Sequence, residues 1–491
     1  MSVEETFKAL TAETGIPLIK ATDIERFVIS PITYWCEIHA DPQLKDPISP
    51  YLQYIFTVGH EYQSEVIEGT YEGATQEIFY DEEEGVLRTL ELMERGERTI
   101  TNMPLMSRSM GLEGRPDLLV RSDEVGSMFG QFSYHVVEIK TARRITKGHV
   151  LQAAAYNRLL GAAQGYEPEE FYILNRDGDI QAVQMADVDQ ELEDVLINML
   201  GVIGGQPIPA CYRSGKWPWE TYVNDLAIKA NDVSLLSGVG PATRETLIAN
   251  GFDKTMDVET APIEALTKLK GIGVTTANRL ISSAKALQQG NPVERSGSPS
   301  LPTATTEVFF DFEGTDPRIG VDGLEVCNYL IGAVIRSPSQ GLSYIPFFAD
   351  SFEEEEANLR KFFEWCKSLE DPIFYHWYHY ERTHLNKMVD YFEINPSEAA
   401  PLLDKLVDLQ PITTKAFAFP AYGEGLKDIA KALGFNWRQA DVDGLASVAL
   451  YFDYIDSGPT ATESRQKILD YNEDDCLATM HIFDWLQAQG Q

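Results

Sequence analysis

Hydrophobic and polar positions alternate in short runs at both ends of the chain, with helical spacing between the runs. Residues 307–313 alternate with a period of two, which predicts a strand, and residues 372–378 form a second apolar strand. Helical periodicity follows over residues 445–486. Nearer the N-terminus, the apolar residues that follow Asp117 within residues 114–120 predict a strand, and residues 134–140 predict its neighbour. Strands interspersed with helices predict an α/β architecture for both outer parts of the chain.

The middle of the chain has a different pattern. Residues 232–290 consist of short helical segments interrupted by glycine, which predicts a small all-α domain. The next residues, 291–306, are rich in Gly, Ser, Pro and Thr and predict a flexible linker. A chain of 491 residues is long enough for about three domains. We therefore expect α/β domains at residues 1–219 and 307–491, on either side of the helical one.

Composition places the chain among globular proteins. Hydrophobic residues make up 44% of the sequence and aromatic residues 11%, so each domain can bury a core. No apolar run reaches the roughly 18 residues that a membrane-spanning helix needs. The start of the chain lacks the basic-then-apolar order of a signal peptide. We expect a soluble cytoplasmic protein without membrane contact.

The formal net charge of −36 is the main objection to a nucleic-acid partner, because affinity for a polyanion normally comes from Lys and Arg. Two features offset it. Clustered carboxylates bind divalent cations, which restore positive charge where a phosphate lies, and helix N-termini bind phosphate through backbone N–H groups. Much of the excess acid lies in runs such as residues 81–84 and 353–356, which are typical of solvated faces. We expect weak DNA binding without metal.

Two carboxylates and a lysine come together on the predicted strands of the first domain. Alternation places Glu138 and Lys140 on one face of their strand, and Asp117 lies on the neighbouring strand. Two carboxylates at that distance repel each other unless a divalent cation lies between them, and oxygen ligands are those that Mg²⁺ prefers. Lys140 is placed to orient an attacking water and to stabilise charge on a phosphate.

Two predicted helices add polar residues to this constellation. Gln152 and Tyr156 are four residues apart and share a helix face, where they could position DNA or the lysine. Upstream, His60 lies on another predicted helix and can contact a metal or a phosphate. Glu61 and Glu65 compete there for one further role, and the sequence ranks neither.

The order and spacing of these motifs resemble the RecB-type branch of the PD-(D/E)xK nucleases, which have a restriction-endonuclease-like fold. The resemblance implies that Asp117, Glu138 and His60 bind metal and that Lys140 is catalytic. It also implies that Gln152 and Tyr156 are accessory residues that position nucleic acid.

Many RecB-type relatives also hold a four-cysteine iron-sulfur cluster. The five cysteines of this chain are widely scattered, which argues against a disulfide framework. Cys36 and Cys211 stand where two cluster ligands would be expected, but the remaining ligands are absent. We expect free thiols and no cluster.

The helical middle domain contains the same glycine turn twice. Residues 236–242 and 269–275 share one apolar-x-Gly-apolar-Gly form, 33 positions apart. Glycine permits the strained turn and lets backbone N–H groups approach a phosphate at the start of the next helix. The segment resembles a tandem helix-hairpin-helix domain. The resemblance implies binding of the DNA backbone without sequence readout, through Gly238, Gly240, Gly271 and Gly273.

The basic residues near the two hairpins differ. Lys268, Lys270 and Arg279 lie near the second hairpin, whereas Arg244 is the only basic residue close to the first. The second hairpin therefore fits a phosphate-binding role better. The alternative is that the two hairpins pack on each other as a spacer.

A second acidic constellation lies in the last domain. Strand alternation directs Asp311 and Glu313 to one face and aromatic residues to the other. Acids surrounded by aromatic bulk are costly to bury without cations. Near the C-terminus, Tyr471 and Asp475 are one helical turn apart and share a face.

These residues resemble the first and third motifs of the DEDD exonucleases, in the variant with tyrosine in the last motif, on an RNase H-like fold. The resemblance implies that Asp311, Glu313 and Asp475 bind two metal ions and that Tyr471 orients the attacking water. The adjacent Asp474 leaves the choice of ligand partly open, although the spacing from the tyrosine favours Asp475.

The second motif departs from the family pattern. Glu381, which follows residues 376–380, supplies the fourth carboxylate with one extra methylene. Asp408 is the reserve candidate for this role, or a structural cap.

The order of the three parts resembles that of RecB-like putative nucleases with a C-terminal exonuclease-like domain. It implies a Mg²⁺- or Mn²⁺-dependent DNA nuclease with a RecB-like site and a 3′-5′ exonuclease-like site, in repair or in degradation of foreign DNA. No G-x-x-x-x-G-K-(S/T) loop occurs, so a separate helicase partner is a further hypothesis. Two alternatives stay open: a nucleic-acid-binding adaptor with decayed sites, and an RNA-processing exonuclease.

Overall fold

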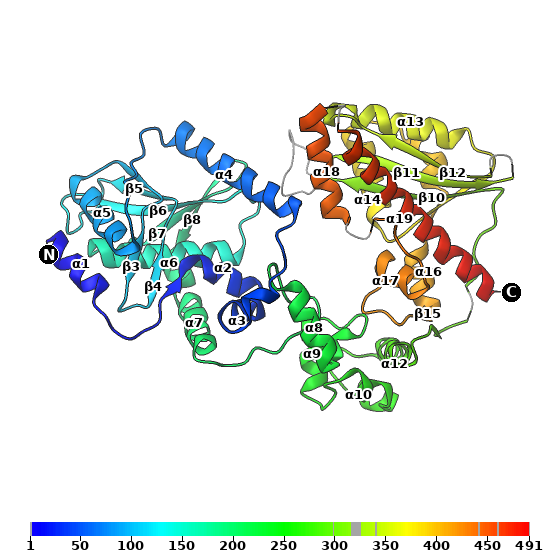
Figure 1. The fold of residues 1–491 in the computed structure, drawn as a ribbon, viewed down its shortest axis with the longest axis horizontal. Coiled ribbons are helices and arrows are strands. Elements are labelled where there is room, and N and C mark those ends of the chain that lie inside the picture. The colour runs from blue at the N-terminus through cyan, green and yellow to red at the C-terminus, as the bar shows by residue number, and fades with distance from the viewer. Residues whose placement is uncertain are drawn as a thin grey trace. The chain divides into compact units, whose positions relative to one another are not determined.

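The chain divides into two compact units (Figure 1). The N-terminal unit comprises Met1–Ile48 and Ile55–Leu226, and the C-terminal unit comprises Ser49–Tyr54 and Ala227–Gln491. The structure, a computed structural model, describes residues 2–297, 299–315, 326–338, 341–439, 442–458 and 461–490. Among these residues no helix combines the length and the apolar character needed to cross a membrane.

The N-terminal unit contains a five-stranded mixed sheet and a smaller three-stranded one. The large sheet has the order β2 (Thr99–Thr101), β5 (Leu118–Ser122), β6 (Ser133–Ile139), β7 (Glu170–Leu174), β8 (Ile180–Gln184). Strands β6 and β7 are parallel, and the other neighbours are antiparallel. The small sheet has the order β1 (Ile19–Lys20), β4 (Leu112–Gly114), β3 (Leu105–Ser107).

The strand predicted from the apolar residues after Asp117 is present as β5. Gly114 belongs to the separate strand β4, and Arg115, Pro116 and Asp117 lie between the two strands. Proline has no N–H to donate to a strand partner, so the ladder is interrupted there. The interruption leaves Asp117 immediately before β5.

Helices lie on both faces of the large sheet. The helices in this part of the chain are α1 (Val3–Thr11), α2 (Ala21–Ile29), α3 (Pro31–His39), α4 (Pro50–Thr70), α5 (Glu82–Arg95), α6 (Lys147–Gln164), α7 (Met185–Ile203) and α8 (Glu220–Ala230), with a short 3-10 turn at Pro42–Leu44. On one face, Val136 and Ile173 pack with the buried helix α6. On the other, Val137 and Ile139 pack against Val66 of α4. The end of β6 therefore lies between two helices.

The C-terminal unit is built on a second five-stranded sheet. Its order is β12 (Gly341–Phe348), β11 (Asn328–Ser337), β10 (Thr306–Gly314), β13 (Pro372–His376), β14 (Leu406–Asp408). Strand β10 is antiparallel to β11 and parallel to β13. The strands predicted over residues 307–313 and 372–378 are thereby confirmed as β10 and β13.

The central strand β10 is buried on both faces. Phe310 and Phe312 belong to one core, whereas Phe309 belongs to another. Alternation places Asp311 and Glu313 on the face of Phe309. The helices of this sheet are α13 (Glu355–Lys367), α14 (Tyr380–Tyr391), α15 (Pro396–Leu403), α16 (Leu409–Ala416), α17 (Leu426–Ala432), α18 (Gly444–Ser457) and α19 (Thr462–Gln489), with a 3-10 turn at Phe352–Glu354 and the short strand β15 (Phe417–Ala418). Helices α18 and α19 both contact β10.

Short helices precede the sheet in the same unit. They are a 3-10 turn at Val233–Leu235, α9 (Pro241–Ile248), α10 (Thr255–Glu259), α11 (Ile263–Thr267) and α12 (Val274–Gln289). Their apolar residues form a separate small core that includes Leu247, Leu266 and Leu280. The predicted small helical domain is therefore present.

The segment expected to be a flexible linker, residues 291–306, is held in place at its beginning. Strand β9 (Val293–Glu294) pairs antiparallel with β15. The following Arg295 donates to the hydroxyl oxygens of Ser282 and Ser283, each at 2.8 Å. Composition does not predict this ordered structure, because the ordered structure depends on a strand partner and side-chain partners outside the segment.

Candidate functional site

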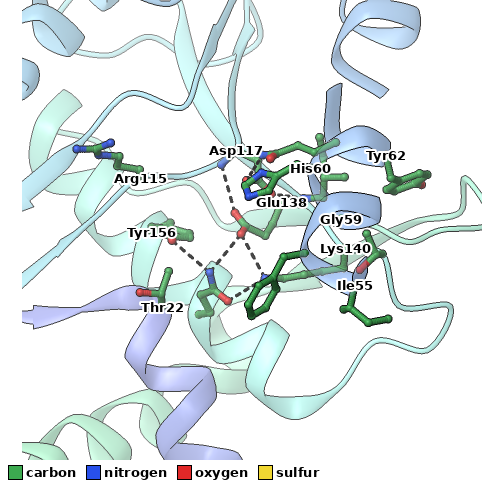
Figure 2. Close-up of a pocket in the computed structure, with 15 residues that line it drawn as sticks. Thr22, Ile55, Gly59, His60, Tyr62, Arg115, Asp117, Glu138, Lys140 and Tyr156 are labelled. Carbon is green, nitrogen blue, oxygen red and sulfur yellow. Dashed lines mark hydrogen bonds and ion pairs between the residues drawn. The ribbon is translucent and has the colours of Figure 1, made fainter. Parts of the chain in front are cut away.

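The first predicted constellation comes together in a cavity of about 370 Å³ in the N-terminal unit (Figure 2). The cavity lies where α4, α6 and the ends of β5 and β6 meet. All six residues predicted for this site line it, namely His60, Asp117, Glu138, Lys140, Gln152 and Tyr156.

Asp117 and Glu138 are held against each other by backbone hydrogen bonds. The Asp117 N–H donates to Glu138 Oε2 at 3.4 Å, and the Ile139 N–H donates to Asp117 Oδ2 at 2.7 Å. Burial raises the pKa of Asp117. Burial and repulsion from Asp117 raise the pKa of Glu138 well above its ordinary value. Such crowding favours a bound cation at this point.

Lys140 adds a positive charge to the two acids. Its Nζ lies 3.4 Å from Glu138 Oε1 and donates to Gln152 Oε1 at 2.8 Å. Burial acts to lower the pKa of Lys140, but the carboxylates of Glu138, Glu25 and Asp117 outweigh it and the net pKa is raised. Lys140 is therefore a cation in this arrangement and stabilises negative charge rather than accepting a proton.

Gln152 and Tyr156 brace this arrangement from α6. Gln152 Nε2 donates to Glu138 Oε1 at 3.3 Å and to the Tyr156 hydroxyl at 3.2 Å. Both residues are almost completely buried. Gln152 thus contacts both the lysine and the acid, and Tyr156 contacts Gln152.

Two residues of this site were missed by motif reasoning. Gln63 on α4 donates to Asp117 Oδ1 at 2.6 Å, and Glu25 on α2 lies 3.7 Å from Lys140 Nζ. Gln63 is three residues after the exposed His60, so helical spacing could have placed it on the same face. Neither Glu61 nor Glu65 is supported as the further site residue on this helix, since Gln63 supplies the contact to Asp117.

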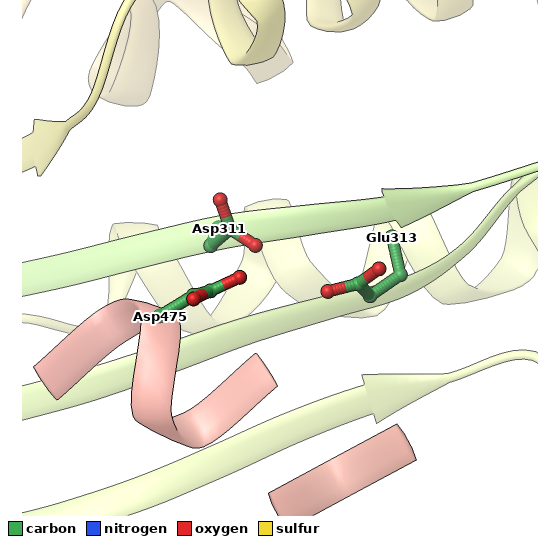
Figure 3. A group of neighbouring side chains, drawn as sticks. All are labelled: Asp311, Glu313 and Asp475. Atoms are coloured by element: carbon green, nitrogen blue, oxygen red, sulfur yellow. The ribbon is translucent and has the colours of Figure 1, made fainter. Parts of the chain in front are cut away.

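The second constellation is a tight group of carboxylates in the C-terminal unit (Figure 3). One oxygen from each of Asp311, Glu313 and Asp475 lies within 4.8 Å of the other two. Strand β10 supplies the first two acids and α19 supplies the third. Among the described residues this is the group of three or more ligand side chains gathered closely enough to hold a metal ion.

Burial and mutual repulsion raise the pKa values of this group. Burial, followed by repulsion from Asp475, raises the pKa of Asp311 well above its ordinary value. Burial and repulsion from Asp311 do the same for Glu313. Burial raises the pKa of Asp475 to about 6, although the Trp437 indole and Lys427 act to lower it. Without cations the group resists full ionisation.

Glu381, the unusual member of the predicted set, lies beside these acids. It lines one cavity together with Asp311, Glu313 and Asp475, and it interacts with Asp311. Burial raises its pKa to about 8. Its Oε2 lies 3.1 Å from Nδ1 of the buried His376, which holds the longer side chain in position.

Two further acids considered for this site, Asp474 and Asp408, make structural contacts instead. Asp474 Oδ1 accepts from Arg438 Nε at 2.8 Å, and its Oδ2 accepts from the Arg438 N–H at 2.7 Å. Asp474 is therefore engaged away from the cluster, and Asp475 faces it. Asp408 caps α16 by accepting from the Gln410 N–H at 3.0 Å.

Tyr471 and three unpredicted residues complete this site. Burial and the Asp475 carboxylate raise the pKa of Tyr471, so its hydroxyl stays protonated and hydrogen-bonds Asp475. Trp437 Nε1 donates to Asp475 Oδ1 at 2.6 Å, and Asn472 Nδ2 donates to Asp311 Oδ2 at 3.2 Å. Lys427 Nζ lies 4.6 Å from the Tyr471 ring centre. Asn472 carried a sequence signal, since it lies within the last motif.

Comparison with known families agrees with part of the motif analysis. A family model described as RNase_H superfamily matches residues 308–487, and one described as SAM-like helix-hairpin-helix tandem matches residues 231–286. The C-terminal unit thus contains an RNase H-like domain and a tandem helix-hairpin-helix domain. Both predictions are confirmed. No curated protein matches the chain. The RecB-like character of the N-terminal unit stays a prediction from its sequence.

The hairpins of the helix-hairpin-helix domain have the expected turns. Gly238 and Gly271 adopt φ of +86° and +81°, a region that favours glycine, and Gly240 and Gly273 are the N-caps of α9 and α12. All four glycines are exposed. Backbone N–H groups at two helix starts are therefore open to a phosphate.

The basic residues of this domain divide into two kinds. Arg244 is buried and donates to both carboxylate oxygens of Asp232, at 2.9 and 2.6 Å, so it is structural. Arg279 pairs with Glu424 of the RNase H-like domain. Lys268 and Lys270 are exposed beside the second hairpin, which keeps that hairpin the better candidate for a phosphate contact.

Proposed function

We propose that this protein is a divalent-metal-dependent nuclease that hydrolyses phosphodiester bonds of DNA. The observation that carries the proposal is the close group of Asp311, Glu313 and Asp475 inside an RNase H-like domain. Carboxylate oxygens are the ligands that Mg²⁺ and Mn²⁺ prefer. Buried acids this crowded are unfavourable unless cations balance their charge.

In the C-terminal site, Asp311, Glu313, Asp475 and Glu381 would hold the cations. Bound cations would supply Lewis-acid activation of the phosphate. Tyr471, protonated and anchored on Asp475, would orient the attacking water. Lys427 adds a positive charge next to Tyr471. This arrangement supports a 3′-5′ exonuclease-like reaction at a strand end.

In the N-terminal site, Asp117 and Glu138 would hold a cation, with His60 as a further ligand at the rim. Lys140 would stabilise charge on the phosphate, and Gln152 keeps the lysine beside Glu138. This second proposal is supported by the order of the motifs and by their meeting in one cavity. The chain would then have two nuclease sites.

We extend the proposal to the biological setting. Two nuclease sites with a sequence-independent DNA-binding module suit DNA repair or the degradation of foreign DNA. A separate helicase would supply single strands, because the sequence contains no G-x-x-x-x-G-K-(S/T) loop. Stimulation of cleavage by a purified helicase with ATP would support that partner, and no stimulation by any helicase tested would remove it.

The test measures cleavage of DNA labelled at the 5′ or the 3′ end, with Mg²⁺, Mn²⁺ or EDTA. Wild type is compared with Asp311→Asn, Lys140→Ala and the double variant. We expect each single change to remove a distinct set of products and the double change to remove all. The matched control is Asp390→Asn, an exposed acid on α14.

Each other outcome has a clear meaning. No cleavage by the wild type with either metal would overturn the proposal in favour of a DNA-binding adaptor. Faster cleavage of labelled RNA than of DNA would instead identify an RNA-processing exonuclease. Loss of all products in the Asp311→Asn variant alone would show that the N-terminal site does not cleave DNA.

A further inference from the structure

Three charged residues join the helix-hairpin-helix domain to the RNase H-like domain. Arg279 on α12 pairs with Glu424, and Arg295 Nη1 lies 3.7 Å from the other oxygen of Glu424. The side chains of Glu424 and Arg295 are only 16% and 11% exposed. Such shielding makes an ion pair stronger than one on an open surface. We call Arg279, Glu424 and Arg295 the joint.

Arg295 is bonded to both domains at once. Besides the hydroxyls of Ser282 and Ser283 on α12, its guanidinium donates to the carbonyl oxygen of Thr414 on α16. A planar guanidinium with donors satisfied in several directions restricts orientation as well as distance. The adjacent pairing of β9 with β15 adds backbone hydrogen bonds across the same boundary. The two domains are thus fixed to each other.

On one side, the joint reaches both hairpins. A Cβ built on Gly238, in the first hairpin, would lie 3.2 Å from Cζ of Arg279, so the guanidinium packs directly against that turn. The second hairpin ends at Gly273, the N-cap of α12, and Arg279 lies on that helix. Arg279 therefore packs against the first turn and lies on the helix that follows the second.

On the other side, the joint reaches the acidic group. The Glu424 carbonyl oxygen accepts from Trp377 Nε1 at 3.3 Å, in the segment that leads into Glu381. Glu424 also directly precedes Gly425, the N-cap of α17, and that helix carries Lys427 next to Tyr471. Along the chain, Trp377 lies four residues before Glu381, and Glu424 lies three residues before Lys427.

We propose that the joint makes the hairpin pair a fixed docking platform for the C-terminal site, so that this site prefers polynucleotides long enough to lie on the hairpins over short oligonucleotides. This inference rests on the proposed function of Asp311, Glu313 and Asp475. A flexible tether supplies only a high local concentration, whereas a fixed platform also orients the bound strand. Binding on the exposed hairpins then lowers KM for long substrates without changing the chemistry.

The test uses Arg279→Gln, Glu424→Gln and the double variant in the full chain. One substrate is the p-nitrophenyl ester of thymidine 5′-monophosphate, which is too small to reach beyond the acidic group. The other is a single strand of about 40 nucleotides, well beyond the roughly 4–16 nucleotides of one single-strand site. The control is Arg360→Gln, whose partners Glu356 and Glu398 lie on α13 and α15, in the other helix layer.

We expect both single variants to raise KM for the long strand about tenfold, with kcat and ester hydrolysis close to wild type. The double variant should be no worse than either single one, because both remove the same ion pair. Hydrogen exchange at the amides of β9 and β15 should become faster in these variants and not in Arg360→Gln.

Two results would overturn the inference. One is an unchanged KM for the long strand in variants whose β9 and β15 amides exchange faster. The other is an equal loss on both substrates, which would indicate a merely structural role. If the wild type cleaves neither substrate, the proposed function fails. The role of the joint is then tested by measuring the affinity of the wild type and the same variants for the long strand in Ca²⁺. Equal affinity of the variants and the wild type would reject that role.

Discussion

Asn472 on α19 occupies the space that a side chain on Gly332 of β11 would need. A Cβ built on Gly332 would lie 1.5 Å from Asn472 Oδ1. From this position Asn472 Oδ1 accepts from the Tyr344 hydroxyl at 2.9 Å, while Nδ2 donates to Asp311 Oδ2 at 3.2 Å. Gly332 also pairs directly with Asp311 in the sheet. The absence of a side chain at Gly332 thus leaves room for the Asn472 amide, which orients the Asp311 carboxylate.

Gly332→Ala should therefore weaken metal binding at the C-terminal site. The new methyl group must displace Asn472, so Asp311 loses its donor. Such overpacking costs about 1–3 kcal/mol of stability. We expect at least a tenfold loss of Mn²⁺ affinity, measured by calorimetry. Gly69→Ala, at a glycine of α4 with open space around it, is the control. Wild-type affinity in Gly332→Ala would contradict this account.

The apo protein should lose stability as the pH rises from about 4 to 8. Burial raises the pKa of Asp475 to about 6 and that of Glu381 to about 8, above their values in an unfolded chain. The folded state then binds protons more tightly, so this stabilisation is present at low pH and disappears as pH rises through these pKa values. Thermal unfolding in EDTA should show it, and Mg²⁺ should raise the midpoint more at pH 8 than at pH 6.

Asp475→Asn tests the same point by removing one charge. In EDTA at pH 8 this variant should be more stable than wild type by roughly 1–3 kcal/mol, since a shift of about two pKa units is involved. It should also respond less to Mg²⁺. If the wild-type apo protein is most stable at pH 8, ionisation of the acidic group does not destabilise the folded state.

Gln152→Leu should impair the N-terminal site alone. Leucine removes the acceptor of Lys140 and a donor to Glu138, while it keeps a similar volume in the buried position. We expect cleavage in an Asp311→Asn background to fall at least tenfold, because hydrogen bonds to charged groups contribute about 1.5–3 kcal/mol. Gln190→Leu, on the exposed side of α7, is the control. Equal cleavage in the two variants would remove the bracing role of Gln152.

Arg244→Ala should destabilise the helix-hairpin-helix domain. The change leaves Asp232 as a buried charge without its bidentate partner, which costs about 3–5 kcal/mol. Chemical denaturation followed by hydrogen exchange of α9 and α12 would measure the loss. The exposed Lys285→Ala on α12 should leave stability close to wild type. If both variants unfold alike, Arg244 is not structural.

Local patterns were enough to identify several elements and most of the acidic residues. Strand alternation correctly placed Asp311 and Glu313 on one face of β10, and helical spacing placed Gln152 and Tyr156 on one face of α6. Spacing from Tyr471 favoured Asp475 over Asp474, and Asp475 is the one that lies beside Asp311 and Glu313. These inferences succeed because the direction of a side chain within one strand or helix depends on backbone periodicity alone.

Partners from distant segments were beyond such reasoning. No periodicity links Gln63 to Asp117, or Trp437 to Asp475. The linker composition of residues 291–306 likewise conceals the strand pair between β9 and β15. These contacts depend on how separate elements pack, and that packing is decided by shape and burial over the whole domain.

The sequence by itself therefore determined which residues carry charge and chemistry and on which face of their element they lie. The tertiary structure alone decided that Asp474 is occupied by Arg438, that Arg244 is buried with Asp232, and that Glu424 pairs with Arg279 of the helix-hairpin-helix domain. The physical reason is that an ion pair or a buried amide needs a partner in space, and neighbours in space are set by the fold and not by spacing along the chain.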